Sequence, residues 1–249
     1  MTLDSSPTVA EVGAYFSGLY ANLTTSPTHA RIGHAALGDG FVGQVGFAGL
    51  PDIRRLAELA GAAPGKRILD LCCGNAGILA LVAQKTGAAV VGVDCCDLAL
   101  RFVYRRRPVV AGLVTADVDH LPFAPASFDG VMSLDGFSPN FNAMVHEAAR
   151  VLRPGGALAM LVSLEVAKAA DFEDALSNAG FQQVRFANDT PECIELLRAW
   201  LGEYRRESVS HIREVGATVH AALVSEIESL LNRVAQKRMI RAYVTAVNT

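Results

Sequence analysis

The sequence carries little charge and no long apolar run. Charged residues make up 19% of its 249 residues and the net charge is −3, so it lacks the basic excess by which a nucleic-acid partner usually shows itself. Its one basic run, Arg105–Arg107, is interpreted as a solvated helix end. No apolar stretch approaches the roughly 18 residues of a membrane span, and residues 1–7 lack the regions of a signal peptide. These absences predict a cytoplasmic protein without a nucleic-acid or membrane partner.

Cysteine is scarce and its spacing excludes the common zinc motifs. The five cysteines form two adjacent pairs, Cys72-Cys73 and Cys95-Cys96, and a single Cys193, with no C-x-x-C spacing. An odd number of cysteines without a secretion signal predicts reduced thiols. Both pairs follow predicted strands, so we interpret them as small apolar lining and expect no metal site.

The apolar content of 51% is high enough for a substantial core, and residues 66–77 organise it. This stretch reads Lys-Arg-Ile-Leu-Asp-Leu-Cys-Cys-Gly-Asn-Ala-Gly and is followed by a helical pattern, which predicts a buried strand, a tight turn and a helix start. Small residues in such a turn let backbone N–H groups approach a ligand closely. The carboxylate of Asp70 repels phosphate, so the turn favours a neutral or cationic ligand.

The next apolar strand, residues 89–93, ends at Asp94, one βαβ step after Asp70. An acid at this position can accept hydrogen bonds from both ribose hydroxyls of a nucleoside. At this point NAD and S-adenosylmethionine (SAM) fit equally. An NAD(P)-dependent oxidoreductase, however, is expected to carry a G-x-G-x-x-G turn, whereas residues 72–77 read Cys-Cys-Gly-Asn-Ala-Gly.

Strands and helices are predicted to alternate through the middle of the chain, which indicates an α/β, Rossmann-like doubly wound sheet. The chain divides into an N-terminal helical cap segment (1–50), a core (51–190), a helical lid or insertion (191–238) and a final strand (239–249). Within the cap segment, residues 31–50 are rich in glycine and are expected to be mobile or closely packed. The predicted strands cover residues 67–71, 89–93, 109–115, 128–133, 157–163, 181–187 and 239–248.

Two further segments distinguish SAM from NAD as the expected cofactor. Residues 115–129, Thr-Ala-Asp-Val-Asp-His-Leu-Pro-Phe-Ala-Pro-Ala-Ser-Phe-Asp, and residues 150–156, Arg-Val-Leu-Arg-Pro-Gly-Gly, occur in order after the two strand-turn motifs. Together the four motifs resemble class I SAM-dependent methyltransferases, most closely the small-molecule branch called type 11. The resemblance covers about residues 50–165. It implies SAM as cofactor and a seven-stranded sheet whose last strand is antiparallel.

The resemblance also implies which residues bind SAM. The Asp70 carboxylate is expected near the methionine end, Asp94 at the ribose hydroxyls and Asp117 at the adenine amino group. Two positions depart from the family's D-x-G-x-G-x-G turn, because Cys72 and Ala76 replace glycines. The remaining cofactor-binding residues are predicted to be Tyr20, Cys72, Gly74, Gly77, Cys95 and Val118.

Catalytic residues are harder to predict because methyl transfer needs little beyond an in-line nucleophile. Asp135 follows the fourth strand, in a segment similar to the Q-D-A-F-L-H stretch of glycine/sarcosine-type methyltransferases, and is a candidate catalytic residue. Ser138 stands where that family has histidine, so His34 is the second candidate base. In the family the N-terminal segment closes the substrate pocket. By this resemblance the candidate pocket residues are Tyr15, Tyr20, His34, Phe41 and Gln44.

The sequence therefore predicts SAM-dependent methyl transfer to the N, O or C atom of a small molecule, in the biosynthesis of a metabolite or natural product. Two alternatives stay open. One is an NAD(P)-dependent oxidoreductase of doubly wound fold, and the other is a SAM-binding protein without catalysis. A homodimer is the default oligomer.

Overall fold

The computed structural model describes residues 7–106, 110–136 and 138–249. Side chains are not described between residues 103 and 109, so the predicted role of the Arg105–Arg107 run lies outside the described side chains. Across the described residues no helix is both long and apolar enough to span a bilayer.

Seven strands of the described residues form one sheet in the order β3-β2-β1-β4-β5-β7-β6. All neighbouring strands are parallel except those paired to β7, which runs antiparallel to both β5 and β6. This confirms the predicted doubly wound sheet with an antiparallel last strand. The strands are β1 (Arg67–Leu71), β2 (Ala89–Asp94), β3 (Gly112–Thr115), β4 (Phe128–Leu134), β5 (Leu152–Glu165), β6 (Phe181–Asn188) and β7 (Met239–Asn248).

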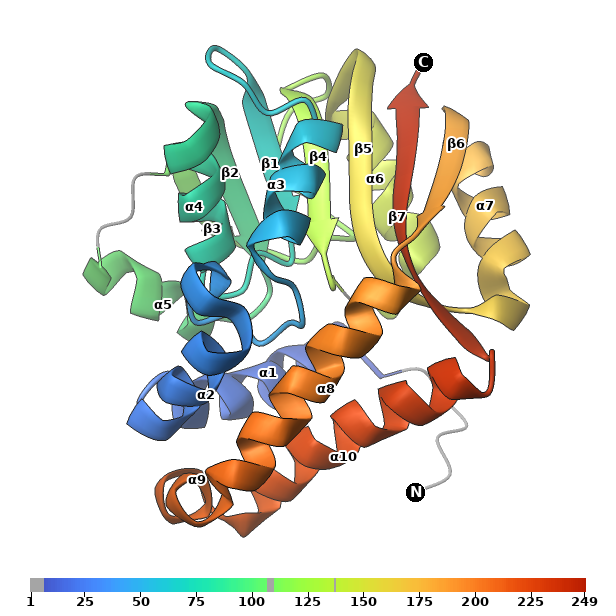
Figure 1. The fold of residues 1–249 in the computed structure, drawn as a ribbon. Coiled ribbons are helices and arrows are strands. Elements are labelled where there is room, and N and C mark those ends of the chain that lie inside the picture. The colour runs from blue at the N-terminus through green and yellow to red at the C-terminus, as the bar shows by residue number, and fades with distance from the viewer. Residues whose placement is uncertain (1–6, 107–109, 137) are drawn as a thin grey trace.

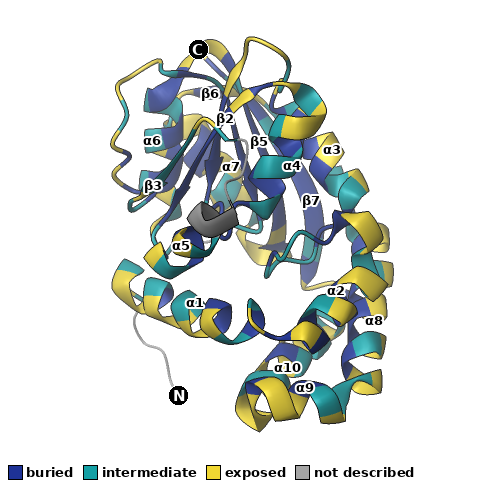
Figure 2. Cartoon of the chain, turned by 90° about the vertical axis from the view of Figure 1, so that its left-hand side faces the viewer, coloured by how far each residue is buried: buried dark blue, intermediate teal, exposed yellow. Residues whose placement is uncertain are grey.

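Helices cover both faces of the sheet because its strands are apolar on both sides. Figures 1 and 2 show the strands as a buried layer between helices. One face packs on α3 (Leu50–Leu59), α4 (Gly77–Thr86) and α5 (Asp97–Arg106), whereas the other packs on α6 (Phe141–Val151) and α7 (Ala169–Asn178).

A third group of helices lies beyond the carboxyl ends of the parallel strands (Figure 1). It combines α1 (Val9–Leu23) and α2 (Pro27–Leu37) with α8 (Thr190–Arg206), α9 (Ser208–Val215) and α10 (Ala217–Ala235). These helices share one apolar core, which includes Leu19, Ile32, Trp200 and Ile227. We call this group the cap. The N-terminal segment and the insertion thus pack together, although some 150 residues separate them. The exact boundaries of the predicted four-part division stay a prediction.

The glycine-rich residues 31–50 were expected to be mobile or closely packed, and the structure shows the close packing. Helix α2 extends through Gly33 to Leu37, because Ser26 caps its start and Pro27 occupies its first turn. A Cβ atom at Gly33 would lie 2.3 Å from the Phe41 ring. Glycine here therefore permits a tight contact between a helix and the loop that follows it.

Glu214 of α9 connects the two parts of the cap. Its carboxylate accepts hydrogen bonds from the Ser26 hydroxyl (2.6 Å), the Thr28 hydroxyl (2.5 Å) and the Thr28 backbone N–H (2.9 Å). The bond from Ser26, followed by those from Thr28, lowers the pKa of Glu214 to about 2 from its ordinary 4.5. A carboxylate on α9 thereby holds the first turn of α2.

We expect Glu214→Gln to lower the free energy of unfolding by about 1 kcal/mol at pH 7, as loss of a helix cap does. Because the folded pKa of Glu214 lies below its unfolded value, its contribution is complete above pH 4.5 and is lost as the pH falls towards 2. Urea unfolding of wild type and variant between pH 7 and pH 3 measures this. The control Glu207→Gln removes only an exposed pair with Arg31 and should change little. Equal stability of wild type and Glu214→Gln at pH 7 would contradict the prediction.

Candidate functional site

The turn after β1, in which Cys72 and Ala76 replace glycines, has a strained backbone. Cys72, Gly74 and Ala76 all have positive φ values, of 60°, 55° and 50°. The two non-glycine residues thus occupy conformations that cost an L-residue about 1–2 kcal/mol. Gly74 cannot be replaced in the same way, because a Cβ atom there would lie 2.2 Å from the Tyr20 hydroxyl. Strain of this kind is typical of functional sites.

Asp94 connects this turn to the end of β2. One carboxylate oxygen accepts from the Gly74 N–H and the other from the Cys96 N–H, each at 2.7 Å. Each oxygen keeps a second lone pair, so the carboxylate can still accept from a ligand. Burial raises the pKa of Asp94, and these two bonds counteract the shift.

Asp70 lies behind the turn, at the end of the neighbouring strand β1. It is buried and does not line the adjacent cavity. Burial first, and then the charge of Asp94, raise the pKa of Asp70 well above its usual value. Two carboxyl groups therefore lie close together in a poorly solvated place. The form with both groups ionised becomes favourable when a positive charge is nearby.

A cavity of about 250 Å³ opens beside the turn, between the sheet and the cap. We call it the sheet-edge cavity. The predicted residues Tyr20, Cys72, Gly74, Asp94, Cys95 and Asp135 all line it, together with Tyr15 and Gln44. A second, small cavity of about 20 Å³ shares Cys72 and Cys95 with it and is also lined by Asp117 and Val118. The structure thus brings most of the predicted site residues together along one edge of the sheet.

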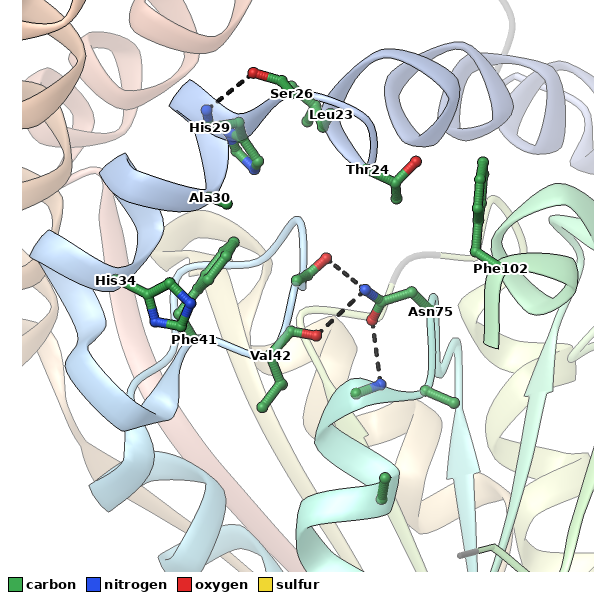
Figure 3. A pocket seen from close by; sticks show the side chains of 14 residues that line it. Leu23, Thr24, Ser26, His29, Ala30, His34, Phe41, Val42, Asn75 and Phe102 are labelled. Atoms are coloured by element: carbon green, nitrogen blue, oxygen red, sulfur yellow. Dashed lines mark hydrogen bonds between the residues drawn. The ribbon is translucent and has the colours of Figure 1, made fainter. Parts of the chain in front are cut away.

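Two predicted site residues lie in a different cavity. His34 and Gly77 line a separate space of about 420 Å³ between α2 and the start of α4, together with Phe41 (Figure 3). His34 is exposed, and its ring nitrogen Nδ1 lies 3.3 Å from the Gly38 carbonyl oxygen. A Cβ atom at Gly77 would lie 2.3 Å from the Val42 carbonyl oxygen. Packing against residue 42 therefore explains this glycine, and the role of His34 as a base stays a prediction.

Asn75 lies between the two cavities and lines both. Its amide nitrogen donates to the carbonyl oxygens of Gly43 (2.6 Å) and Val42 (3.4 Å), and its amide oxygen accepts from the Gly77 N–H (3.2 Å) (Figure 3). These bonds attach the loop between α2 and α3 to the turn after β1. The sequence analysis did not select Asn75, because its position in the motif is a variable one.

Gln44 stabilises this same loop from within. Its amide nitrogen donates to the carbonyl oxygens of Gly40 (2.9 Å) and Ala48 (3.1 Å), and its amide oxygen accepts from the Val42 N–H (2.7 Å). Its donors and one acceptor site are therefore used inside the loop. The side chain that was predicted to face a substrate also fixes the shape of the cavity wall.

Asp135 forms an ion pair with Arg241, which is the charged residue of the otherwise apolar strand β7. The guanidinium is 2% exposed, and both of its terminal nitrogens donate to the two carboxylate oxygens. It also donates to the Ser163 hydroxyl at 3.1 Å. Asp135 in turn accepts from the Phe47 N–H at 3.2 Å. The carboxylate thereby connects the end of β4 to strand β7 and to the loop between α2 and α3.

Besides Asn75, the sequence analysis missed Arg241 and Glu226. Arg241 left a signal, because an arginine inside a buried strand needs a buried partner. Glu226 of α10, which lines the sheet-edge cavity, left none, because it lies among other polar residues of an amphipathic helix. Only the position of α10 relative to the sheet reveals it.

Comparison with known proteins agrees with this geometry. Residues 68–156 match the methyltransferase domain family. A fatty-acid O-methyltransferase from Mycolicibacterium smegmatis is 30% identical over 176 residues, which are 60% of this chain and 64% of that protein. In general the chain spans about half the length of the curated relatives it matches.

Solved structures share the fold over nearly the whole chain. Phosphoethanolamine N-methyltransferase 2 from Haemonchus contortus, in complex with phosphomonomethylethanolamine and S-adenosylhomocysteine, has a TM-score of 0.76 at 21% identity, covering 94% of this chain and 60% of that one. The [4+2]-cyclase SpnF also has a TM-score of 0.76, at 18% identity, covering 98% and 97%. The motifs, the sheet order and these matches agree: residues 68–156 form a methyltransferase domain, and the chain has the fold of the class I SAM-dependent methyltransferases.

Proposed function

We propose that this chain binds SAM along the carboxyl edge of the sheet and transfers its methyl group to a small molecule in the sheet-edge cavity. The observation that carries the proposal is the placement of Asp94, Cys95, Asp117 and Val118 around two neighbouring cavities that share Cys72 and Cys95 in their walls. Asp94 accepts from the ribose hydroxyls, Asp117 accepts from the adenine amino group and the Val118 N–H lies beside it. Cys72 and Cys95 flank the ring.

The methionine end of SAM lies over the turn after β1. Tyr20 covers Gly74 from α1 and closes this side of the cavity. The sulfonium then lies near the Asp70–Asp94 carboxyl pair, whose mutual repulsion a positive charge relieves. Methyl transfer itself depends on orientation, which can supply about 7–11 kcal/mol of the barrier. The cap encloses the cavity and favours a small acceptor over a polymer.

Asp135 acts in this proposal as a positioning residue. Its carboxylate is used by Arg241 and by the Phe47 N–H, so it holds the cavity wall in place. Its predicted catalytic role stays a prediction.

The two alternatives from the sequence differ in what they predict. A dinucleotide-binding oxidoreductase binds NADH, but the family assignment and the turn sequence favour SAM. A protein that binds SAM without methyl transfer binds S-adenosylhomocysteine equally well, and only turnover separates it from an enzyme.

Calorimetry with S-adenosylhomocysteine and with NADH tests the cofactor. We expect S-adenosylhomocysteine to bind, and Asp94→Ala to weaken it by about 1–3 kcal/mol, the range for a lost hydrogen bond to a charged group. The control Asp97→Ala changes an exposed acid three residues on, which pairs with Arg101, and should leave the affinity unchanged. Binding of NADH alone, or an unchanged affinity in Asp94→Ala, would contradict the proposal.

Binding of SAM should release protons. The pKa of Asp70 is raised in the free protein, and the sulfonium lowers it again by stabilising the carboxylate. The affinity for SAM should therefore increase as the pH rises through the raised pKa of Asp70. Calorimetry in buffers of different ionisation enthalpy measures the protons released, and Asp70→Asn should abolish the effect. Equal proton release in wild type and Asp70→Asn would exclude Asp70 as the source.

The ion pair beneath the cavity should be essential for stability. Arg241→Met leaves a partly buried carboxylate without its partner, and we expect a loss of about 3–5 kcal/mol in the free energy of unfolding. Arg241→Met combined with Asp135→Asn should lose less than the sum of the single variants, because the unpaired charge is then absent. Urea unfolding of the three variants gives the coupling energy. Strict additivity would show that the pair contributes nothing.

A further inference from the structure

The sheet-edge cavity has an acidic lining with no basic partner. Carboxylates of Asp94, Asp135 and Glu226 reach it, whereas its described lining residues include no lysine, arginine or histidine. The buried guanidinium of Arg241 does not line the cavity and is already paired with Asp135. The cavity therefore has a net negative potential and disfavours anionic ligands.

Of these three carboxylates, that of Glu226 is the one without a partner among the described residues. Asp94 accepts two backbone N–H groups and Asp135 is paired with Arg241, whereas Glu226 makes neither a hydrogen bond nor an ion pair with the part of the chain that is described. It lies one helical turn from Leu230 on α10, and both residues line the cavity. Its carboxylate is available to a ligand.

Among the described residues, the titratable groups that interact electrostatically with Glu226 include Tyr15 of α1, Tyr204 of α8 and Asp135 after β4, none of which carries a positive charge. Glu226 is exposed at the mouth of the cavity, and desolvation by the protein atoms around it, followed by the charge of Asp135, raises its pKa. A cationic or proton-donating group of a ligand would relieve both effects.

The charge balance of methyl transfer separates the possible acceptors. When an amine attacks, the new N–C bond forms as the C–S bond breaks, the electron pair goes to sulfur, and the positive charge moves to nitrogen. An amine that enters as an ammonium ion first gives one proton to a carboxylate, and from that point the cavity holds one positive charge until the products leave. A carboxylate or phenolate acceptor instead has to enter as an anion beside the carboxylates of Asp94 and Glu226, at a cost in Coulomb energy, and leaves the cavity without a cation, because Arg241 is already paired with Asp135.

We infer that the acceptor is an amine on an otherwise apolar molecule, and that Glu226 binds its nitrogen. This inference rests on the function proposed above. The proton that the nitrogen loses passes to the Glu226 carboxylate and from there to solvent. The rest of the molecule contacts the apolar lining, which includes Phe16, Leu19, Val45, Phe47, Leu134 and Leu230.

The test compares three ligands of equal length. Hexylamine, hexanoate and 1-hexanol are titrated at pH 7 into the protein saturated with S-adenosylhomocysteine. We expect hexylamine to bind about tenfold more tightly than hexanoate, as suits a partly desolvated charge contact. Glu226→Gln should remove most of this preference and leave the affinity for S-adenosylhomocysteine within about twofold, because the substitution keeps the shape of the side chain.

The matched control is Glu228→Gln on the same helix. Glu228 pairs with Arg205 and does not line the cavity, so this variant should keep the preference for the amine. Weak or absent binding of hexylamine, equal binding of hexanoate, or an unchanged preference in Glu226→Gln would overturn the inference. A wild-type protein that fails to bind S-adenosylhomocysteine would instead overturn the proposed function, so the two failures are distinguishable.

Discussion

The buried carboxyl groups of Asp70 and Asp94 are the constraint on which the site depends. They lie at the ends of adjacent parallel strands, where β1 and β2 bring them together. Burying two like charges is costly without a compensating cation. The protein partly offsets the cost by donating the Gly74 and Cys96 N–H groups to Asp94. The rest of the compensation is left to a ligand, and a sulfonium has the required charge.

The cap turns this edge of the sheet into an enclosed cavity. Its core is formed by helices from both ends of the chain. Three polar connections stabilise it, one between its own helices and two between the cap side and the sheet. Glu214 joins α9 to α2, Asn75 joins the loop after α2 to the cofactor turn, and the Asp135–Arg241 pair joins that loop to β4 and β7. Each connection links segments that are distant in sequence, so the cavity exists only in the folded chain.

The sequence predicted the core well because its signals are local. The apolar runs located all seven strands, and β1 had the predicted bounds of residues 67–71, whereas β5 begins at Leu152, five residues before its predicted start. Positive φ values at Cys72 and Ala76 agree with a turn that usually has glycine there. The sequence was less informative where a contact decides the role of a residue. Gly77 is packed against Val42, and His34 lines a second cavity with Phe41.

What the sequence determined by itself is the doubly wound sheet, its antiparallel last strand, and the order in which acids reach its edge. The alternating strands and helices and the positions of the acids follow from hydrophobic periodicity and from short motifs, whereas the antiparallel last strand was implied by the resemblance to a known family that those motifs carry. The tertiary structure alone decided that Asp135 is paired with Arg241 and that Glu226 faces the cavity. Both depend on where β7 and α10 lie relative to β4, and such a position results from packing between segments about 100 residues apart, which no local pattern records.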